Sequence, residues 1–137
     1  MLKNKPIVLD SWAILSFLQK EKSSSIIEDI VHEAIENQTN LYIHSINMGE
    51  VWYILAMKIG QEKANVIVEN LIDLGIQVID TDWTLTKKAA SYKLLGGISY
   101  ADCFAAALAS LKNAKLLTCD LEFERVNHEV EIIWLER

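Results

Sequence analysis

Four acidic residues in this sequence occupy positions from which they could hold metal ions. Asp10 and Asp120 each follow a short apolar run that reads as a strand, while Glu50 and Asp102 lie near the start of segments with helical spacing. The carboxyl ends of parallel strands form the edge of a sheet at which ligands bind. Carboxylates that converge there repel one another unless cations lie between them, and hard divalent cations such as Mg²⁺ prefer oxygen ligands. Two such ions about 4 Å apart could support displacement at a phosphodiester.

The same acids could instead serve the backbone. The segments 47–50 and 99–102 both fit the capping-box pattern, in which the acid satisfies a free N–H at the start of a helix. Asp10 could cap a helix that begins at the next residue, and Asp120 could belong to a turn. Spacing alone leaves both interpretations open.

The elements that must position these acids alternate along the chain. We predict strands over the short apolar runs 7–9, 41–44, 76–79, 115–118 and 132–134. We predict helices over the segments 11–20, 47–59, 62–74, 83–95 and 99–113, with a further helix beginning at Ser25. This alternation predicts a single α/β domain over residues 1–137. Its central, mostly parallel five-stranded sheet would be flanked by helices on both faces.

Composition and charge limit the class of protein. The chain of 137 residues is 51% hydrophobic and 23% charged, which is typical of a globular domain. Thirteen Lys and Arg against 19 Asp and Glu give a net charge of −6, which excludes a protein that holds nucleic acid by bulk positive charge. Cys103 and Cys119 form no CxxC pair, and the three histidines are scattered, so no zinc-binding spacing exists. No apolar run approaches the ~18 residues of a membrane span, and we expect a reduced, cytoplasmic protein.

Four motifs occur in the order found in the PIN domain family, a metal-dependent ribonuclease fold, and the resemblance covers essentially the whole chain. The run IVLDSWAILSFL resembles the family's opening strand, Asp, Ser or Thr, and apolar helix. SINMGEVWYIL resembles its segment with Glu early in a helix, and GISYADCFAAALA resembles its Asp ahead of an Ala-rich helix. KLLTCDLEF resembles its last motif, a strand followed by Thr-x-Asp and a second acid. Length and layout resemble the VapC-type toxins of toxin–antitoxin pairs.

The resemblance implies roles for individual residues. It implies a catalytic and metal-binding set of four acids, namely Asp10, Glu50, Asp102 and Asp120. Glu122 would be an outer metal ligand or an acid just behind the ligands, and Ser11 and Thr118 would be polar supports. Cys119 stands where Gly is frequent in the family and Glu122 where Asp is common, but neither departure removes one of the four acids.

The implied reaction is hydrolysis of an RNA phosphodiester by water activated with Mg²⁺ or Mn²⁺. Arg125, five residues after Asp120, is the candidate phosphate contact. The weaker candidates are Lys20, Lys22, Lys87, Lys88 and Lys93. The resemblance implies an antitoxin that binds a groove made partly by the apolar helices near the start of the chain. It also implies a homodimer formed through other helices.

Other polar residues have simpler interpretations. His44 is expected to pack within its strand, and Cys103 lacks a neighbouring base that would activate a nucleophile. Asp80 and Asp82 also follow a strand, but the family's strand order puts that strand at the sheet edge, away from the site. Asp82 is therefore expected to cap the helix that follows it.

Three alternatives stay open. The chain could be a catalytically inactive PIN-like module that binds RNA or a protein, which a metal titration would distinguish. It could be a housekeeping RNA-processing nuclease, which would lack the small antitoxin gene that accompanies a toxin. A receiver or Asp-x-Asp phosphatase is disfavoured because Trp12 stands where the second acid of a phosphatase would lie.

Overall fold

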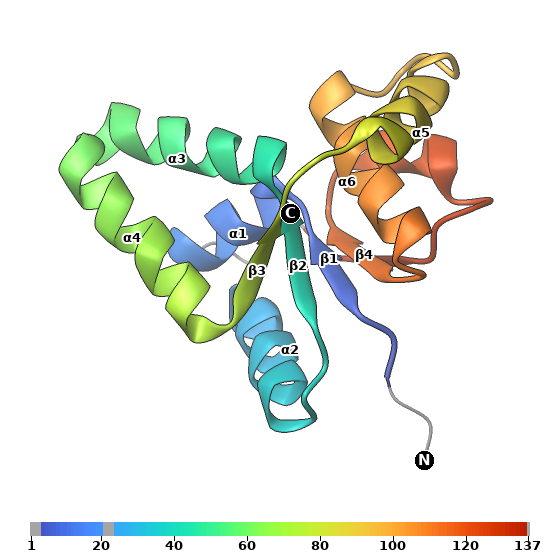
Figure 1. The fold of residues 1–137 in the computed structure, drawn as a ribbon. Coiled ribbons are helices and arrows are strands. Elements are labelled where there is room, and N and C mark those ends of the chain that lie inside the picture. Colours follow the sequence, from blue (N-terminus) through green and yellow to red (C-terminus); the bar gives the residue numbers. More distant parts are fainter. Residues whose placement is uncertain (1–3, 21–23, 137) are drawn as a thin grey trace.

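The structure is a computed structural model that describes residues 4–20 and 24–136. Its elements follow in the order β1 (Ile7–Leu9), α1 (Ser11–Leu18), α2 (Ser24–Glu36), β2 (Leu41–His44), α3 (Ser45–Ile59), α4 (Gln61–Leu74), β3 (Ile76–Ile79), α5 (Trp83–Lys93), α6 (Tyr100–Leu111), β4 (Lys115–Thr118), the 3₁₀ helix η1 (Leu121–Val126) and β5 (Ile132–Trp134). Figure 1 shows these elements along the chain. The α/β fold class and the five strands that the sequence predicts are confirmed.

The five strands form one sheet in the order β3-β2-β1-β4-β5, and every pair is parallel. The chain builds outward from β1 through β2 to β3, then crosses to the other side of β1 to form β4 and β5. The direction of strand addition therefore reverses between β1 and β4, which makes a topological switch point. β3 lies at the sheet edge, as the sequence analysis expects.

The alternation of side chains along each strand divides the core into two layers. Ile7 and Leu9 face a cluster that includes the buried residues of α1 to α4, whereas Val8 faces a second cluster built from α5, α6 and η1. Figure 1 shows α3 and α4 on one side of the sheet and α5 and α6 on the other. Helices thus cover both faces of the sheet, as predicted.

Several helix boundaries differ from the predicted ones. α1 and α6 end about two residues early, α5 ends at Lys93 and α2 begins at Ser24. By contrast, α3 begins two residues early, at Ser45 rather than at Asn47. The imidazole of His44 causes this earlier start because its Nδ1 accepts a hydrogen bond from the N–H of Ile46 at 3.0 Å. A histidine cap lies outside the usual set of Ser, Thr, Asp and Asn.

Within the part of the chain that the structure describes, no helix combines the length and the apolar character that crossing a bilayer requires.

Candidate metal centre

The switch point brings Asp10 and Asp120 to the same edge of the sheet. Asp10 directly follows β1, and Asp120 lies two residues beyond the end of β4, the strand hydrogen-bonded to β1. Neighbouring parallel strands end on the same side, so their following residues meet there. Asp10 and Asp120 therefore lie at one edge of the sheet because β1 and β4 are neighbours.

Asp10 is fixed by hydrogen bonds to both of its carboxylate oxygens. Its side chain is 1% exposed, and Oδ1 caps α1 by accepting from the N–H of Ala13 at 2.8 Å. Oδ2 accepts from the hydroxyl of Thr118 at 2.5 Å. The Thr118 oxygen in turn accepts from the N–H of Asp120 at 2.9 Å. Thr118 thus links the two strand-end acids through its hydroxyl.

Asp102 lies in the first turn of α6. Its carboxylate does not cap the helix, because another acid accepts the hydrogen bond that a capping box would give it. Ser99 caps α6 because its hydroxyl accepts from the N–H of Asp102 at 3.2 Å, as the capping-box pattern requires. The reciprocal bond comes instead from Glu122, whose Oε1 accepts from the N–H of Ser99 at 2.8 Å. The Asp102 carboxylate is therefore available for another role.

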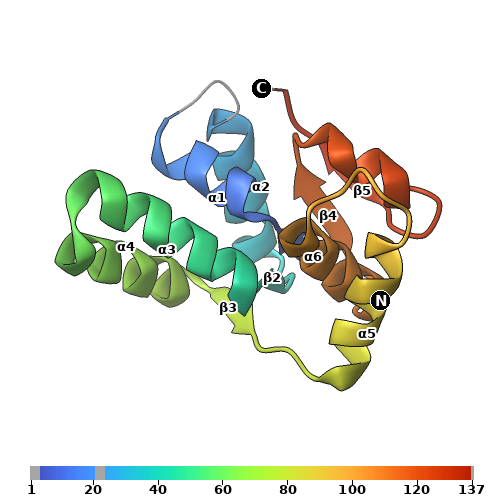
Figure 2. The ribbon, with the colours of Figure 1, turned by 90° about the horizontal axis from the view of Figure 1, so that it is seen from above.

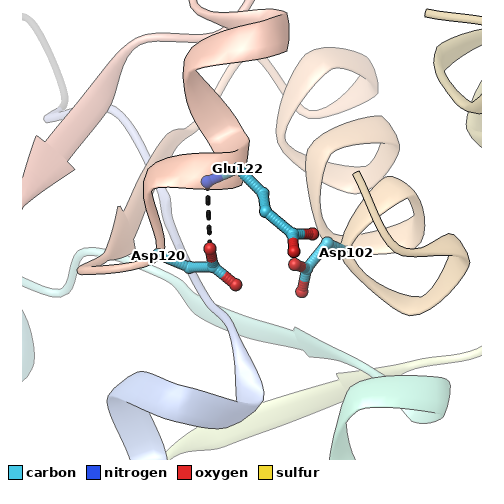
Figure 3. Close-up of side chains that lie close together, drawn as sticks. All are labelled: Asp102, Asp120 and Glu122. Atoms are coloured by element: carbon cyan, nitrogen blue, oxygen red, sulfur yellow. Dashed lines mark hydrogen bonds between the residues drawn. The ribbon is translucent and has the colours of Figure 1, made fainter. Parts of the chain in front are cut away.

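Asp102, Asp120 and Glu122 form a compact cluster of carboxylates. One side-chain oxygen from each lies within 4.8 Å of the others. Figure 3 shows the three carboxylates facing one another, with the Asp120 Oδ1 accepting from the N–H of Glu122 at 2.9 Å. This bond makes Asp120 the cap of η1, so the turn interpretation of Asp120 is also correct.

Glu50 approaches the cluster from α3, on the other layer of helices. It lies in the second turn of that helix, so the expectation that it sits at a capping-box position is wrong. Its half-buried carboxylate accepts a hydrogen bond from the side chain of Asn47 at 3.3 Å. Its charge lies close enough to raise the pKa of Asp10, although Glu50 stands outside the compact three-acid group.

The electrostatics of the site favour a cation. Burial raises the pKa of Asp10 from 3.8 to about 7, and the charges of Asp120 and Glu50 add to this shift. Burial raises the pKa of Asp102 to about 8, together with the neighbouring carboxylates of Asp120, Asp10 and Glu122. Without a cation, the site therefore keeps protons at neutral pH to reduce its own repulsion. An all-carboxylate donor set of this kind fits a hard divalent cation such as Mg²⁺ or Mn²⁺.

Two other predicted site residues stand apart from the carboxylates. Ser11 is the half-buried first residue of α1, and within residues 4–20 and 24–136 its hydroxyl has no hydrogen bond to the four acids. Arg125 is exposed at the end of η1, and its guanidinium lies against Gly97 in the loop before α6. Of the weaker candidates, Lys20 pairs with Glu28 at 3.0 Å and Lys88 pairs with Glu129 at 2.9 Å, and Lys22 lies outside the described residues.

Asp82, His44 and Cys103 have surroundings that fit the structural roles expected of them. Asp82 caps α5 by accepting from the N–H of Leu85 at 2.8 Å. His44 is fully buried and its ring lies 4.9 Å from that of Phe104. Burial raises the pKa of the Cys103 thiol to about 11, so the nucleophilic thiolate is scarce at neutral pH.

One residue of the site was missed at the sequence level. Asn47 is fully buried between Glu50 and the backbone of α6, but the sequence analysis treats it only as the start of a helix. Its position three residues before Glu50 was a usable signal, because residues three apart share one face of a helix.

Comparisons with known proteins agree with the parallel α/β fold described above. The PIN domain family matches residues 7–129, and the chain therefore belongs to this family. No curated protein matches the chain in sequence.

Three solved structures illustrate the similarity of fold. DNA-bound VapBC from Salmonella typhimurium superposes with a TM-score of 0.75 at 20% identity, covering 95% of this chain and 98% of that chain. VapBC-1 from nontypeable Haemophilus influenzae gives 0.73 at 18% identity, covering 93% and 96%. VapC20 from Mycobacterium tuberculosis, described as a sarcin-ricin loop cleaving toxin, gives 0.62 at 14% identity, covering 80% and 86%.

Proposed function

We propose that the protein is a divalent-metal-dependent endoribonuclease, the toxin of a VapBC-type toxin–antitoxin pair. The observation that carries this proposal is the convergence of Asp102, Asp120 and Glu122, with Asp10 bound behind them by Thr118. Such a cluster is electrostatically costly unless cations occupy it. Membership of the PIN family and the similarity to VapC toxin structures support the same activity.

The acids would hold the metal from three directions. Asp10, Asp120 and the neighbouring Glu122 of η1 come from the strand ends. Asp102 comes from the start of α6 and Glu50 from α3. Mg²⁺ or Mn²⁺, when bound, supplies Lewis acidity that polarises a phosphoryl oxygen and lowers the pKa of water. The hydrogen bonds that hold the carboxylates fix where a phosphodiester must lie to react. No histidine base or serine nucleophile is needed.

Arg125 is the proposed contact to the RNA backbone. It is exposed, and its guanidinium lies against the loop that leads into α6, the helix that carries Asp102. A guanidinium presents several donors to phosphate oxygens. Contacts of this kind would add local positive charge on a protein whose net charge is −6.

An antitoxin and a second copy of the chain are the proposed partners, in the cytoplasm. Partly buried apolar side chains on α1, including Trp12 and Phe17, lie at the surface of the first core layer. Met57 on α3 is 81% exposed, and these helices fit the proposed antitoxin groove. Trp83 and Leu111 are exposed on α5 and α6 and fit a homodimer interface on the other layer.

Cleavage of RNA by the purified, antitoxin-free protein tests the activity. Total tRNA and rRNA are incubated with and without Mg²⁺ or Mn²⁺. We expect metal-dependent cutting that Asp102→Asn reduces at least about 100-fold, because a carboxylate that holds the cation is lost. Asp82→Asn is the matched control, since asparagine preserves the cap of α5 and the residue lies away from the site.

Two outcomes would overturn the assignment. Equal cutting by the wild type and Asp102→Asn would place the activity outside this site. A folded protein that neither binds Mn²⁺ nor cuts either RNA would favour the inactive PIN-like module. A neighbouring small antitoxin gene separates a toxin from a housekeeping nuclease.

A further inference from the structure

Asn47 is a fully buried amide that joins two helices from opposite layers of the fold. Its Nδ2 donates to Oε1 of Glu50 at 3.3 Å and to the backbone carbonyl of Ala101 at 3.1 Å. Glu50 is on the same helix, α3, whereas Ala101 directly precedes Asp102 on α6. In Figure 2 the start of α3 lies beside α6. Both hydrogens of the amide are therefore directed at the metal-binding region.

The hydrogen-bond pattern fixes the orientation of this amide. Both neighbours of Nδ2 are oxygens that only accept, so the reversed orientation would place the Asn47 oxygen against two other oxygens. In the orientation observed, Oδ1 of Asn47 is buried and has no hydrogen-bond partner among the described residues. An unpartnered buried oxygen lowers stability, so an apolar residue of similar volume would suit packing alone better.

In the described part of the chain, a single hydrogen bond holds the Glu50 carboxylate, whereas Asp10 and Asp120 each have more than one. Asp10 accepts two hydrogen bonds, and Asp120 is held through both its N–H and its Oδ1. Among the described residues, the Glu50 carboxylate is bonded by Asn47 alone. A half-buried glutamate without that donor is free to turn toward water, because its long side chain regains rotamer freedom.

We propose that Asn47 is a positioning residue that fixes the Glu50 carboxylate relative to Asp102 and so completes the metal site. This inference rests on the proposed function of the acids as metal ligands. The proposed role uses the two hydrogens of Asn47, which face the carboxylate of Glu50 and the carbonyl of Ala101. Residues that orient metal ligands in this way typically contribute 10- to 100-fold to metal affinity.

Binding of Mn²⁺ alone, measured by titration calorimetry, tests the inference. Asn47→Leu keeps similar volume but cannot donate, and we expect it to lose about 10- to 100-fold in Mn²⁺ affinity. Asn47→Ser is smaller but keeps a hydroxyl that donates directly or through a water, so we expect a smaller loss. A packing role predicts the opposite order, because serine leaves a cavity. Asn70→Leu, the same change at an exposed position on α4, is the control.

A double-mutant cycle shows whether Asn47 acts through Glu50. If it does, Asn47→Leu added to Glu50→Gln lowers Mn²⁺ affinity no further than Glu50→Gln alone. Fully additive losses would overturn the proposed route, as would unchanged affinity in Asn47→Leu. Denaturation midpoints of each variant show that the compared samples are folded. If Asn47→Leu does not fold, Asn47→Ser takes its place in the cycle.

A metal-free readout separates this inference from the proposed function. In crystal structures without metal, we expect Glu50 to face the other acids in the wild type and to turn outward in Asn47→Leu. If the wild type fails to bind Mn²⁺, the proposed function is wrong, and these two structures still decide what Asn47 does. If Glu50 keeps its place in Asn47→Leu, the positioning role is wrong.

Discussion

An acid of this site can cap a backbone N–H with one oxygen and keep the other oxygen for a cation. Asp120 accepts from the N–H of Glu122 through Oδ1, which leaves its second oxygen facing Asp102. Glu122 likewise uses Oε1 for the N–H of Ser99. The two interpretations that the sequence left open are therefore compatible. A backbone bond restrains each carboxylate and reduces the entropy lost when a cation binds.

Thr118 gives the first prediction at this scale. Thr118→Val keeps the shape but removes the hydroxyl that donates to Asp10 and accepts from Asp120. We expect Mn²⁺ affinity to fall about 10- to 100-fold, because both ligands lose an orienting bond. Titration calorimetry measures it, with Thr84→Val at an exposed position on α5 as the control. Equal affinities in the two variants would contradict the supporting role of Thr118.

The raised pKa values predict how stability depends on pH. The pKa of Asp10 is about 7 and that of Asp102 about 8 in the folded state, both above the ordinary 3.8. The folded protein therefore keeps protons that the unfolded chain has released. Through these groups, the free energy of unfolding of the metal-free protein decreases as pH rises from about 4 to about 8.

Asp102→Asn isolates this effect. The variant carries no titrating group at this position, so we expect it to be more stable than the wild type at pH 8 by about 1 kcal/mol. At pH 4.5 the Asp102 side chain is protonated, and the difference should nearly vanish. Denaturant unfolding in EDTA measures both values. A gain that is no larger at pH 8 than at pH 4.5 would contradict the assigned protonation.

At the scale of elements, the sequence predicts the strands and most helices because their patterns are local. The cap of α5 by Asp82 follows from a single strand-to-helix junction. The start of α3 could not be predicted this way, since it depends on the buried imidazole of His44. The bond between Glu122 and Ser99 joins residues 23 apart in the chain, and only the folded arrangement of α6 and η1 brings them together.

The loop before α6 provides a prediction about elements. Gly96 and Gly97 both have φ of +71°, which disfavours other residues, but only at Gly97 would a Cβ approach Arg125, at 2.9 Å. We expect Gly96→Ala to cost about 1 kcal/mol in stability from the backbone alone. Gly97→Ala should cost more, because it also displaces the guanidinium.

Arg125→Ala tests the origin of that difference. With the guanidinium removed, the two glycine substitutions should have equal effects on the denaturation midpoint. If Gly97→Ala remains the more harmful of the two, the contact with Arg125 does not explain the difference.

At the scale of the whole molecule, the switch point between β1 and β4 determines where the site lies. The sequence identifies the four acids by family resemblance, but their meeting depends on the strand order β3-β2-β1-β4-β5. Two layers of helices then contribute from opposite faces, with Glu50 on α3 and Asp102 on α6. Asn47 escapes sequence reasoning because its second partner, Ala101, is 54 residues away.

Titration of the wild-type protein with Mn²⁺ at pH 7 tests the central claim most directly, namely that these carboxylates form a cation site. Calorimetry in two buffers of different ionisation enthalpy measures both affinity and proton release. We predict that binding releases roughly one proton or more, because the cation displaces protons from Asp10 and Asp102. Asp102→Asn should bind more weakly and release fewer protons. Absence of binding, or binding without proton release that Asp102→Asn leaves unchanged, would contradict the claim.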